Sequence, residues 1–441
     1  MADTAFSLSD NRIELPHSFR KLSARQKREL LSELLDLSPT EMRASLASEE
    51  LLDLADVMVE SAVGVMPVPL GVASGIRVDG RVVNLPMAVE EPSVVAAATY
   101  AGRLVSRGGE SFHTSTSGQV MTAQIAIDEW TAGAEQRIRD AERELHSELM
   151  EILGPMTRRG GGYRGIDVSG NAESGLLVVY LHVDTRDAMG ANIINTAAEA
   201  LRGPLERLSG GTVLMAILTN AAPRRRARAS FSMPVERLAR GGHDGASMAR
   251  RIVRANTFAN TDSLRAVTHN KGVMNGISSL ALATGNDTRA IEAAAHAHAA
   301  RDGRYRALTE YSTDGERLYG SLELPLAVGT VGGAVGFHPV TSLALKILFL
   351  DDDVEPSADR LSRCAVSLGL AQNLAALMAL VSEGIQRGHM RQHARRLAWQ
   401  AGARDAELQQ LAQRVWDNGT FNIETARELL HELRTAPQRH D

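Results

Sequence analysis

The sequence predicts an α+β protein in which a ferredoxin-like unit is inserted into a larger, mainly helical one. Three observations predict this architecture. The middle third alternates strand-like runs with amphipathic helical segments in the order β-α-β-β-α-β. Helical patterns dominate the segments on both sides of it, and from Gln386 onward the chain is charged and poor in large apolar residues. The predicted domains are therefore 1–113 with 225–383, the insert 114–224, and a small helical unit 384–441.

The first hundred residues read as helices, then a hairpin, then a helix. Helical patterns run from Ser23 to Val63. Two alternating runs follow, Gly71–Val78 and Arg81–Met87, and the Asp79-Gly80 pair between them is a strong hairpin-turn signal. After the second run the chain reaches an apolar helical pattern over Val94–Val105.

The insert is predicted from four strands and two helices. Its elements are the strands Gln119–Asp128, Gly165–Val168, Leu176–Asp184 and Thr212–Leu218, with helices over Gly133–Leu153 and Ala188–Arg202. In the ferredoxin-like arrangement such a sheet carries both helices on one face.

The remainder of the large unit combines helices with one strand pair. Helical patterns cover Val235–Thr257 and Ser357–Glu383, and a strand pair is predicted over Leu308–Tyr319 and Gly320–Ala327. Cys364 lies within the second helical pattern, so we expect it to pack in the core.

Composition excludes several classes of protein. Of the 441 residues 44% are apolar, as in globular proteins, while the net charge of -5 and an aromatic content of 4% argue against nucleic-acid binding. Apolar runs stop short of the ~20 residues of a membrane span. Met1–Asp10 has acidic residues and no signal-peptide pattern, and a single cysteine suits a reducing compartment. We therefore expect a cytoplasmic protein without membrane or nucleic-acid partners.

A lysine and a carboxylate stand out near the centre of the second half. Lys271 lies in the segment Asn270–Gly276, which we interpret as a polar, glycine-containing turn. Asp287 follows a similar turn and precedes the helical run Thr288–Arg301. Together they could polarise a carbonyl and manage its proton. Alternatively, Asp287 is simply the N-cap of that helix.

Two further groups could transfer protons. Glu91 ends an apolar strand before Pro92, where burial would raise its pKa and let it act as an acid, although helix capping would also explain it. His389 follows a glycine in a polar segment, so we expect it to be accessible and able to titrate. The other histidines considered lack partner carboxylates at ligand spacing, so no metal is predicted: His269, His296 and His298.

Two glycine-containing turns and a basic run could contact anions. Helix-start amides near Asp187–Asn192 could hold a diphosphate, although an ordinary capped helix start is the simpler interpretation. The turn Gly329–Ala334 permits close backbone approach to a ligand, or only relieves crowding. Arg224–Arg226 could neutralise phosphates, but a solvated strand explains most of these side chains.

At these positions the chain resembles the bacterial, class II hydroxymethylglutaryl-coenzyme A reductases. Six motifs in the family's order carry the resemblance: EEPSVVAAA (Glu90–Ala98), DAMGAN (Asp187–Asn192), THNKGVMNG (Thr268–Gly276), ATGND (Ala283–Asp287), AVGTVGGA (Ala327–Ala334) and EGIQRGHM (Glu383–Met390). They cover nearly the whole chain except its termini. The resemblance implies a large helical domain around a central helix, an inserted ferredoxin-like cofactor domain and a mobile C-terminal flap. It also implies an obligate dimer or larger homo-oligomer with active sites at the subunit interface.

The resemblance also assigns site residues. The family's catalytic positions correspond to Glu91, Lys271, Asp287 and His389. Substrate contacts are implied for Ser93, Arg265 and Asn275 around the hydroxymethylglutaryl group, Asn220 near the reacting centre and Asn373 near coenzyme A. The nicotinamide cofactor, NADH or NADPH, would be bordered by Asp187, Met189, Gly190, Asn192, Gly329, Gly332 and Gly333.

The implied reaction reduces hydroxymethylglutaryl-coenzyme A to mevalonate and coenzyme A with two hydrides. A non-catalytic coenzyme A-binding or regulatory protein on the same fold is the alternative, and it predicts the loss of a catalytic residue. All four are present.

Two departures from the family pattern affect finer predictions. Ser61 stands where the family commonly has an asparagine, so a contact at the dimer interface is in doubt. Near the end of the first insert helix, where NADH-preferring members have an aspartate, this chain reads Ile152–Pro155 followed by Arg158 and Arg159. We therefore expect NADPH to be preferred, because these arginines tolerate a 2′-phosphate.

Overall fold

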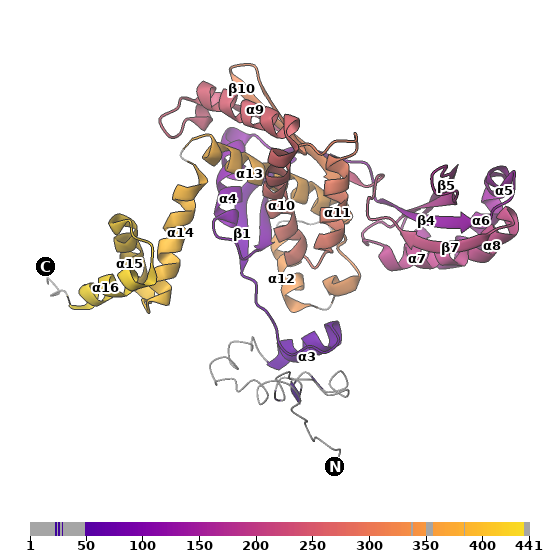
Figure 1. Ribbon diagram of the computed structural model, residues 1–441, viewed down its shortest axis with the longest axis horizontal. Helices are drawn as coiled ribbons and strands as arrows, with labels where there is room; N and C mark the ends of the chain where they lie inside the picture. The colour runs from indigo at the N-terminus through magenta and orange to yellow at the C-terminus, as the bar shows by residue number, and fades with distance from the viewer. Residues whose placement is uncertain are drawn as a thin grey trace, which may run out of the picture. The chain divides into compact units, whose positions relative to one another are not determined.

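The computed structural model describes residues 49–336, 338–349, 356–382 and 384–435, together with Ser23, Arg25, Gln26 and Glu29 (Figure 1). The chain forms two units, Met1–Pro69 and Leu70–Asp441, each described by itself. In the first unit helix α3 spans Glu49–Met58. Most of the other helical residues predicted before Val63 lie outside the described part.

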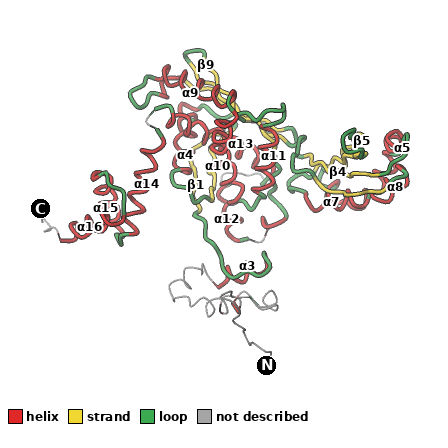
Figure 2. The backbone as a smooth tube through the Cα atoms, viewed as in Figure 1, coloured by secondary structure: helices red, strands yellow, loops and turns green. Residues whose placement is uncertain are grey.

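The second unit contains both helices and strands as far as Pro325, and its described residues beyond that point contain helices but no further strand, which confirms the predicted α+β class (Figure 2). Its strands are β1 (Leu70–Val78), β2 (Arg81–Ala88), β3 (His113–Thr116), β4 (Val120–Asp128), β5 (Gly162–Gly170), β6 (Leu177–Asp184), β7 (Thr212–Leu218), β8 (Arg226–Pro234), β9 (Thr309–Thr313) and β10 (Arg317–Pro325). Its α-helices are α4 (Val94–Val105), α5 (Ala134–Asp140), α6 (Glu142–Thr157), α7 (Ala191–Ala200), α8 (Arg202–Ser209), α9 (Gly245–Thr261), α10 (Ser263–Ala283), α11 (Thr288–Ala299), α12 (Pro339–Leu348), α13 (Ala358–Leu380), α14 (Ile385–Gln400), α15 (Asp405–Asn418) and α16 (Ile423–Thr435). Short 3₁₀ turns are η2 (Arg107–Gly109), η3 (Val235–Leu238) and η4 (Gly333–Gly336).

The middle of the chain forms an antiparallel sheet in the order β5-β6-β4-β7. Alternate residues of β4, including Met121, Ile125 and Ile127, are fully buried against apolar side chains of α5 to α8 such as Leu145 and Ile194. This spacing of two is what a sheet with one covered face requires. The domain boundaries themselves stay a prediction.

The rest of the second unit is built around α10 and α13. The sheet β3-β8-β10-β9 and the hairpin β1-β2 contribute to the same core. Where α10 and α13 cross, a Cβ on Gly276 would lie 2.9 Å from the Leu368 carbonyl oxygen, and one on Gly369 would lie 2.8 Å from Ile277. The two glycines therefore permit the close approach of these helices. Helix α13 is long and apolar enough to cross a membrane, but most of it is buried inside the protein.

This packing corrects the interpretation of Asn270–Gly276 as a turn, because the whole segment lies inside α10. Sequence propensity favours a break at Gly272 and Gly276, since glycine is a poor helix former. Burial against α13 overrides that preference. Lys271 is therefore held on a rigid helix.

Other element boundaries also differ from prediction. The helix expected over Gly133–Leu153 is divided into α5 and α6, and η3 followed by a separate α9 replaces the continuous Val235–Thr257 helix. The β9-β10 turn falls at Asp314, earlier than predicted, because its Oδ1 accepts hydrogen bonds from the amides of Glu316 and Arg317.

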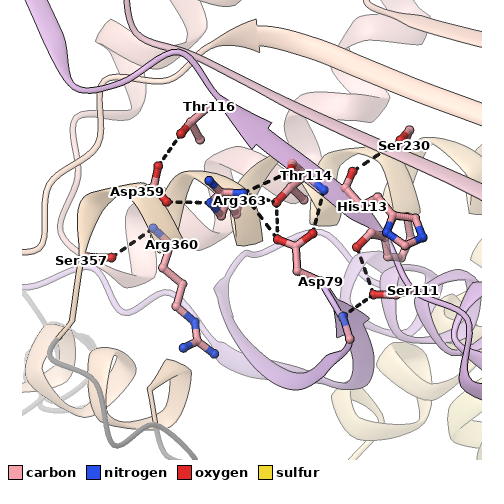
Figure 3. Close-up of polar contacts among 12 residues, drawn as sticks. Asp79, Ser111, His113, Thr114, Thr116, Ser230, Ser357, Asp359, Arg360 and Arg363 are labelled. Carbon is pink, nitrogen blue, oxygen red and sulfur yellow. Dashed lines mark hydrogen bonds and ion pairs between the residues drawn. The ribbon is translucent and has the colours of Figure 1, made fainter.

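A polar network fastens the start of α13 to the neighbouring strands (Figure 3). The Arg363 guanidinium lies 2.6 Å from Asp359 and donates to the Thr114 carbonyl oxygen at 3.1 Å. Asp79, in the β1-β2 turn, accepts from the Thr114 amide at 2.8 Å, and Thr116 donates to Asp359. The hairpin turn, β3 and α13 are thereby joined.

Candidate active site

A cleft of about 590 Å³ runs along the exposed face of α10. Lys271, Asn275, Ser278 and Leu282 line it, and their spacing of three to four residues places them on one side of the helix. The opposite wall comes from the end of β2 and the following turn, including Glu91. The floor of the cleft is therefore a helix packed in the core, and its chemistry comes from projecting side chains.

The structure brings together Lys271 and Glu91, which are 180 residues apart in sequence. Lys271 Nζ donates to Glu91 Oε2 at 2.6 Å. The lysine side chain is 58% exposed and the glutamate 34%. An ion pair this accessible contributes about 1 kcal/mol or less to stability, so its position in a cleft is better explained by chemistry than by folding.

A second hollow of about 360 Å³ is lined by several glycines together with apolar and polar side chains such as Met156, Ile193 and Asn286. Predicted cofactor residues that line it are Met189, Gly190, Asn192, Gly329, Gly332 and Gly333. The Ala188–Met189 segment and Gly329 approach so closely that a Cβ on Gly329 would lie 2.6 Å from the Met189 nitrogen. We call this hollow the groove.

Helix-start amides that no side chain caps make the groove suitable for a dinucleotide. Helix α7 begins after Gly190, whose φ of 94° is left-handed, and no side chain caps its first amides. Uncapped amides at a helix start favour an anionic group. The donors and glycines present therefore fit a nicotinamide dinucleotide.

Asp287 lies at the point in the sequence where residues that line the groove are followed directly by residues that line the cleft. It lines the groove, whereas the next residues, Thr288 and Arg289, line the cleft. The N-cap interpretation is confirmed, because its Oδ1 accepts from the amides of Arg289 at 3.0 Å and Ala290 at 3.1 Å. A contact between Asp287 and the lysine stays a prediction.

The predicted substrate residues are only partly brought together. Asn275 lines the cleft, whereas Ser93, Arg265 and Asn220 line neither hollow. Asn373 is 1% exposed and its side chain contacts Thr309, Tyr311 and His269 in the core. Any role of these four residues toward substrate stays a prediction.

Two other predicted site residues, Asp187 and His389, are not among the described residues that line the cleft or the groove. The Asp187 carboxylate does not line the groove, but accepts from the Ala358 amide at the start of α13 at 2.9 Å. Its direct contact with cofactor stays a prediction. The side chain of His389, on α14, lies outside the described part.

Sequence reasoning missed three groups. His296 does have a carboxylate partner, Glu292 at 3.1 Å, and both line the cleft; the spacing of four residues within one helix was the available signal. Asn286 contacts the groove loop, and Arg225 is 1% exposed instead of being a solvated strand residue. Among the described residues no cluster of three or more histidine, cysteine or acidic side chains could hold a metal.

Comparison with known proteins decides the family. A family model described as hydroxymethylglutaryl-coenzyme A reductase matches residues 23–394. The chain belongs to the hydroxymethylglutaryl-coenzyme A reductase family. The 3-hydroxy-3-methylglutaryl-coenzyme A reductase of Archaeoglobus fulgidus is 40% identical over 422 residues, 95% of this chain and 94% of that protein.

Solved structures of the family agree. A Streptococcus pneumoniae reductase structure has a TM-score of 0.72 and 41% identity, covering 95% of this chain and 99% of its own. Another, described as a class II reductase bound to NADPH in open conformations, has a TM-score of 0.72 and 40% identity, covering 93% and 99%. The class II resemblance is thus confirmed. Membership of this family confirms the predicted hydroxymethylglutaryl-coenzyme A reductase function, and the non-catalytic alternative has no support.

Proposed function

We propose that the cleft is where the thioester of hydroxymethylglutaryl-coenzyme A is reduced, with Lys271 and Glu91 as the groups that contact the reacting carbonyl. The ion pair between them is the single observation that carries this assignment. A fixed ammonium opposite a carboxyl group can stabilise a developing oxyanion and provide a proton to it.

Each step places a different demand on these side chains. During reduction of the thioester, the Lys271 ammonium stabilises the negative charge on the carbonyl oxygen, and the thiolate leaves when the resulting hemithioacetal collapses to an aldehyde. Glu91 then supplies a proton to the aldehyde oxygen as mevalonate forms. Asp287, at the edge of the groove, tunes the lysine. A reduced nicotinamide bound in the groove would supply one hydride to each reduction, so the oxidised cofactor would have to be exchanged for a second reduced molecule between the two steps.

We assign His389 to protonation of the leaving thiolate. The resemblance to the family supports this role, since His389 stands in its EGIQRGHM motif. Without a proton, the thiolate would add back to the aldehyde and reverse the first half of the reaction. Helix α14 carries this residue in a small unit with its own core, where Leu411 and Leu430 are buried.

We infer a preference for NADPH and a homodimer. Arg158 and Arg159, exposed just after α6, support the first inference because they can neutralise a 2′-phosphate. The second is supported by α10, whose cleft face continues into Leu264 and Val267, which are 85% and 55% exposed. A second copy would cover these side chains and complete the site. A sedimentation measurement tests the dimer, and a monomer with full activity would reject it.

The decisive test has two parts. The first assays reduction of hydroxymethylglutaryl-coenzyme A and oxidation of mevalonate with NADH and with NADPH. The second compares reduction of the thioester and of free mevaldehyde by His389→Gln. Reduction of the thioester should fall, whereas reduction of free mevaldehyde, which has no leaving thiolate, should be largely spared. Equal loss with both substrates would reject the role of His389. Absence of any turnover in the unaltered protein with either cofactor would reject the proposed cleft chemistry.

A further inference from the structure

One buried arginine joins the two loops of the groove, the Ala188–Met189 segment and the loop that contains Gly329. Arg225 Nη1 donates to the Ala188 carbonyl oxygen at 3.1 Å and to that of Met189 at 3.2 Å. Its Nη2 donates to the Val328 carbonyl oxygen, next to Gly329. A single guanidinium therefore holds both segments whose close approach forms the groove.

Burying this charge has a cost that packing alone does not require. Arg225 is 1% exposed, and its Nε has no hydrogen-bond partner. Burial lowers its pKa to about 10, opposed in part by the carboxylates of Asp184 and Asp187. An apolar residue would fill the same space without the desolvation cost of a buried charge. What only arginine provides is a planar set of donors that reaches several carbonyl groups at once.

An asparagine fastens the same loop from the other side. Asn286 Oδ1 accepts from the Gly329 amide at 2.7 Å, while its Nδ2 donates to the Gly329 carbonyl oxygen at 3.2 Å. The Nδ2 group also donates to Thr284 Oγ1 at 3.0 Å. Both backbone groups of Gly329 are thus bound by the residue immediately before Asp287.

These contacts form one connected path from the groove to the active site. It runs from Arg225 through the Ala188–Met189 segment and Gly329 to Asn286, and so to Asp287. A shift of about 1 Å between cofactor and catalytic groups can cost as much as 100-fold in rate.

We propose that Arg225 and Asn286 are positioning residues that set the separation of the two groove loops and hold the bound nicotinamide in register with Asp287. Arg225 lines neither hollow, so it acts only through the backbone it holds, whereas Asn286 holds Gly329 and also borders the groove. This inference rests on the proposed use of the groove by NADPH.

The test compares variants of both residues with matched controls. Arg225→Met and Asn286→Ala remove the hydrogen bonds to the groove loops. Arg225→Lys keeps the positive charge but loses the planar set of donors. Asn286→Asp keeps only the oxygen that accepts from the Gly329 amide. Arg137→Met is the arginine control, because Arg137 also donates to several carbonyl groups of the insert, including those of Leu208 and Ala132, but does not line the groove. Asn422→Ala removes an asparagine that accepts from one amide in the C-terminal helices.

The primary readout is the Kd for NADPH, titrated by fluorescence without the second substrate, alongside both KM values, kcat and the thermal midpoint of the cofactor-free protein. We expect Arg225→Met and Asn286→Ala to raise the NADPH Kd by roughly 10- to 100-fold, with the KM for hydroxymethylglutaryl-coenzyme A changed by less than about threefold. Arg225→Lys and Asn286→Asp should fall between these and the unaltered protein. Both controls should bind NADPH normally.

Unchanged NADPH affinity in folded Arg225→Met and Asn286→Ala would overturn the proposal, as would an equal loss in Arg137→Met. If Arg225→Met fails to fold, the two Asn286 variants decide the question alone. Failure of the unaltered protein to bind NADPH would instead reject the proposed function of the groove.

Discussion

The cleft and the groove are built from different kinds of residue. The cleft presents charged side chains, Lys271 and Glu91, which are partly exposed on otherwise regular elements. The groove is lined mainly by glycines and uncharged side chains, and the charged group that holds its two loops, Arg225, is buried and lines neither hollow.

The difference separates chemistry from placement. A side chain in the cleft can be removed without disturbing the fold, so its loss should appear in kcat. Gly329 in the groove cannot be enlarged without moving backbone, so its substitution should change cofactor affinity. The following predictions test this division, starting with the largest expected effect.

Lys271→Ala should lower kcat by about 100- to 1,000-fold, because the oxyanion loses its fixed cation. Cofactor affinity should be nearly unchanged, as measured by NADPH titration. Lys346→Ala, which removes an exposed lysine in the last turn of α12, is the matched control and should retain activity. A comparable loss of NADPH binding in Lys271→Ala would contradict the division between the two regions.

Gly329→Ala should raise the KM for NADPH by about 5- to 30-fold, about 1 to 2 kcal/mol, because the added methyl group meets the Met189 nitrogen at 2.6 Å. The loop must move to relieve that contact. Gly203→Ala provides the control, since the new methyl group there meets only the far end of Arg207 at 3.6 Å. Normal cofactor kinetics in Gly329→Ala would show that the close approach of the loops is dispensable.

Replacing Arg158 and Arg159 together by alanine should raise the KM for NADPH by about threefold to tenfold and leave that for NADH unchanged. Both side chains are exposed, so each contact to a phosphate is worth about 1 kcal/mol or less. Arg207→Ala serves as an exposed-arginine control. A preference of the unaltered protein for NADH by tens of fold would remove the basis of this prediction.

The smallest effect on catalysis is expected from substitution of His269, which lies on the buried face of α10, opposite Lys271. His269 is 2% exposed, and burial lowers its pKa from 6.5 to about 4. The unfolded chain therefore binds a proton near pH 6.5 that the folded protein accepts only near pH 4. Stability from the neutral imidazole is fully present above pH 6.5 and is lost as the pH falls toward 4, by about 3 kcal/mol in total.

Urea unfolding of His269→Gln between pH 4 and 7 measures this contribution. The variant should be less stable at neutral pH, since it loses the contact with Thr309, but its stability should fall less steeply on acidification. His113→Gln, a substitution in strand β3, controls for general effects of histidine loss. Parallel pH profiles for His269→Gln and the unaltered protein would show that the buried imidazole is not the group responsible.

Local patterns predicted the elements whose cause is local. The Asp79-Gly80 turn joins β1 to β2 as expected, the helix over Val94–Val105 has the predicted bounds, and Asp287 caps α11. Each depends on a few neighbouring residues: a turn dipeptide, an apolar period or a capping side chain.

The sequence by itself determined the α+β class, these local elements and, through its motifs, the family. Only the tertiary structure decided that Lys271 stands on a helix, that Arg225 is buried beneath the groove and that Asn373 lies in the core. The physical reason is the same in each case. Helix propensity is a weak local preference, worth about 1 kcal/mol or less per residue, and the preference of a polar side chain for water is offset by buried hydrogen bonds, so contacts with segments far away in the chain outweigh both.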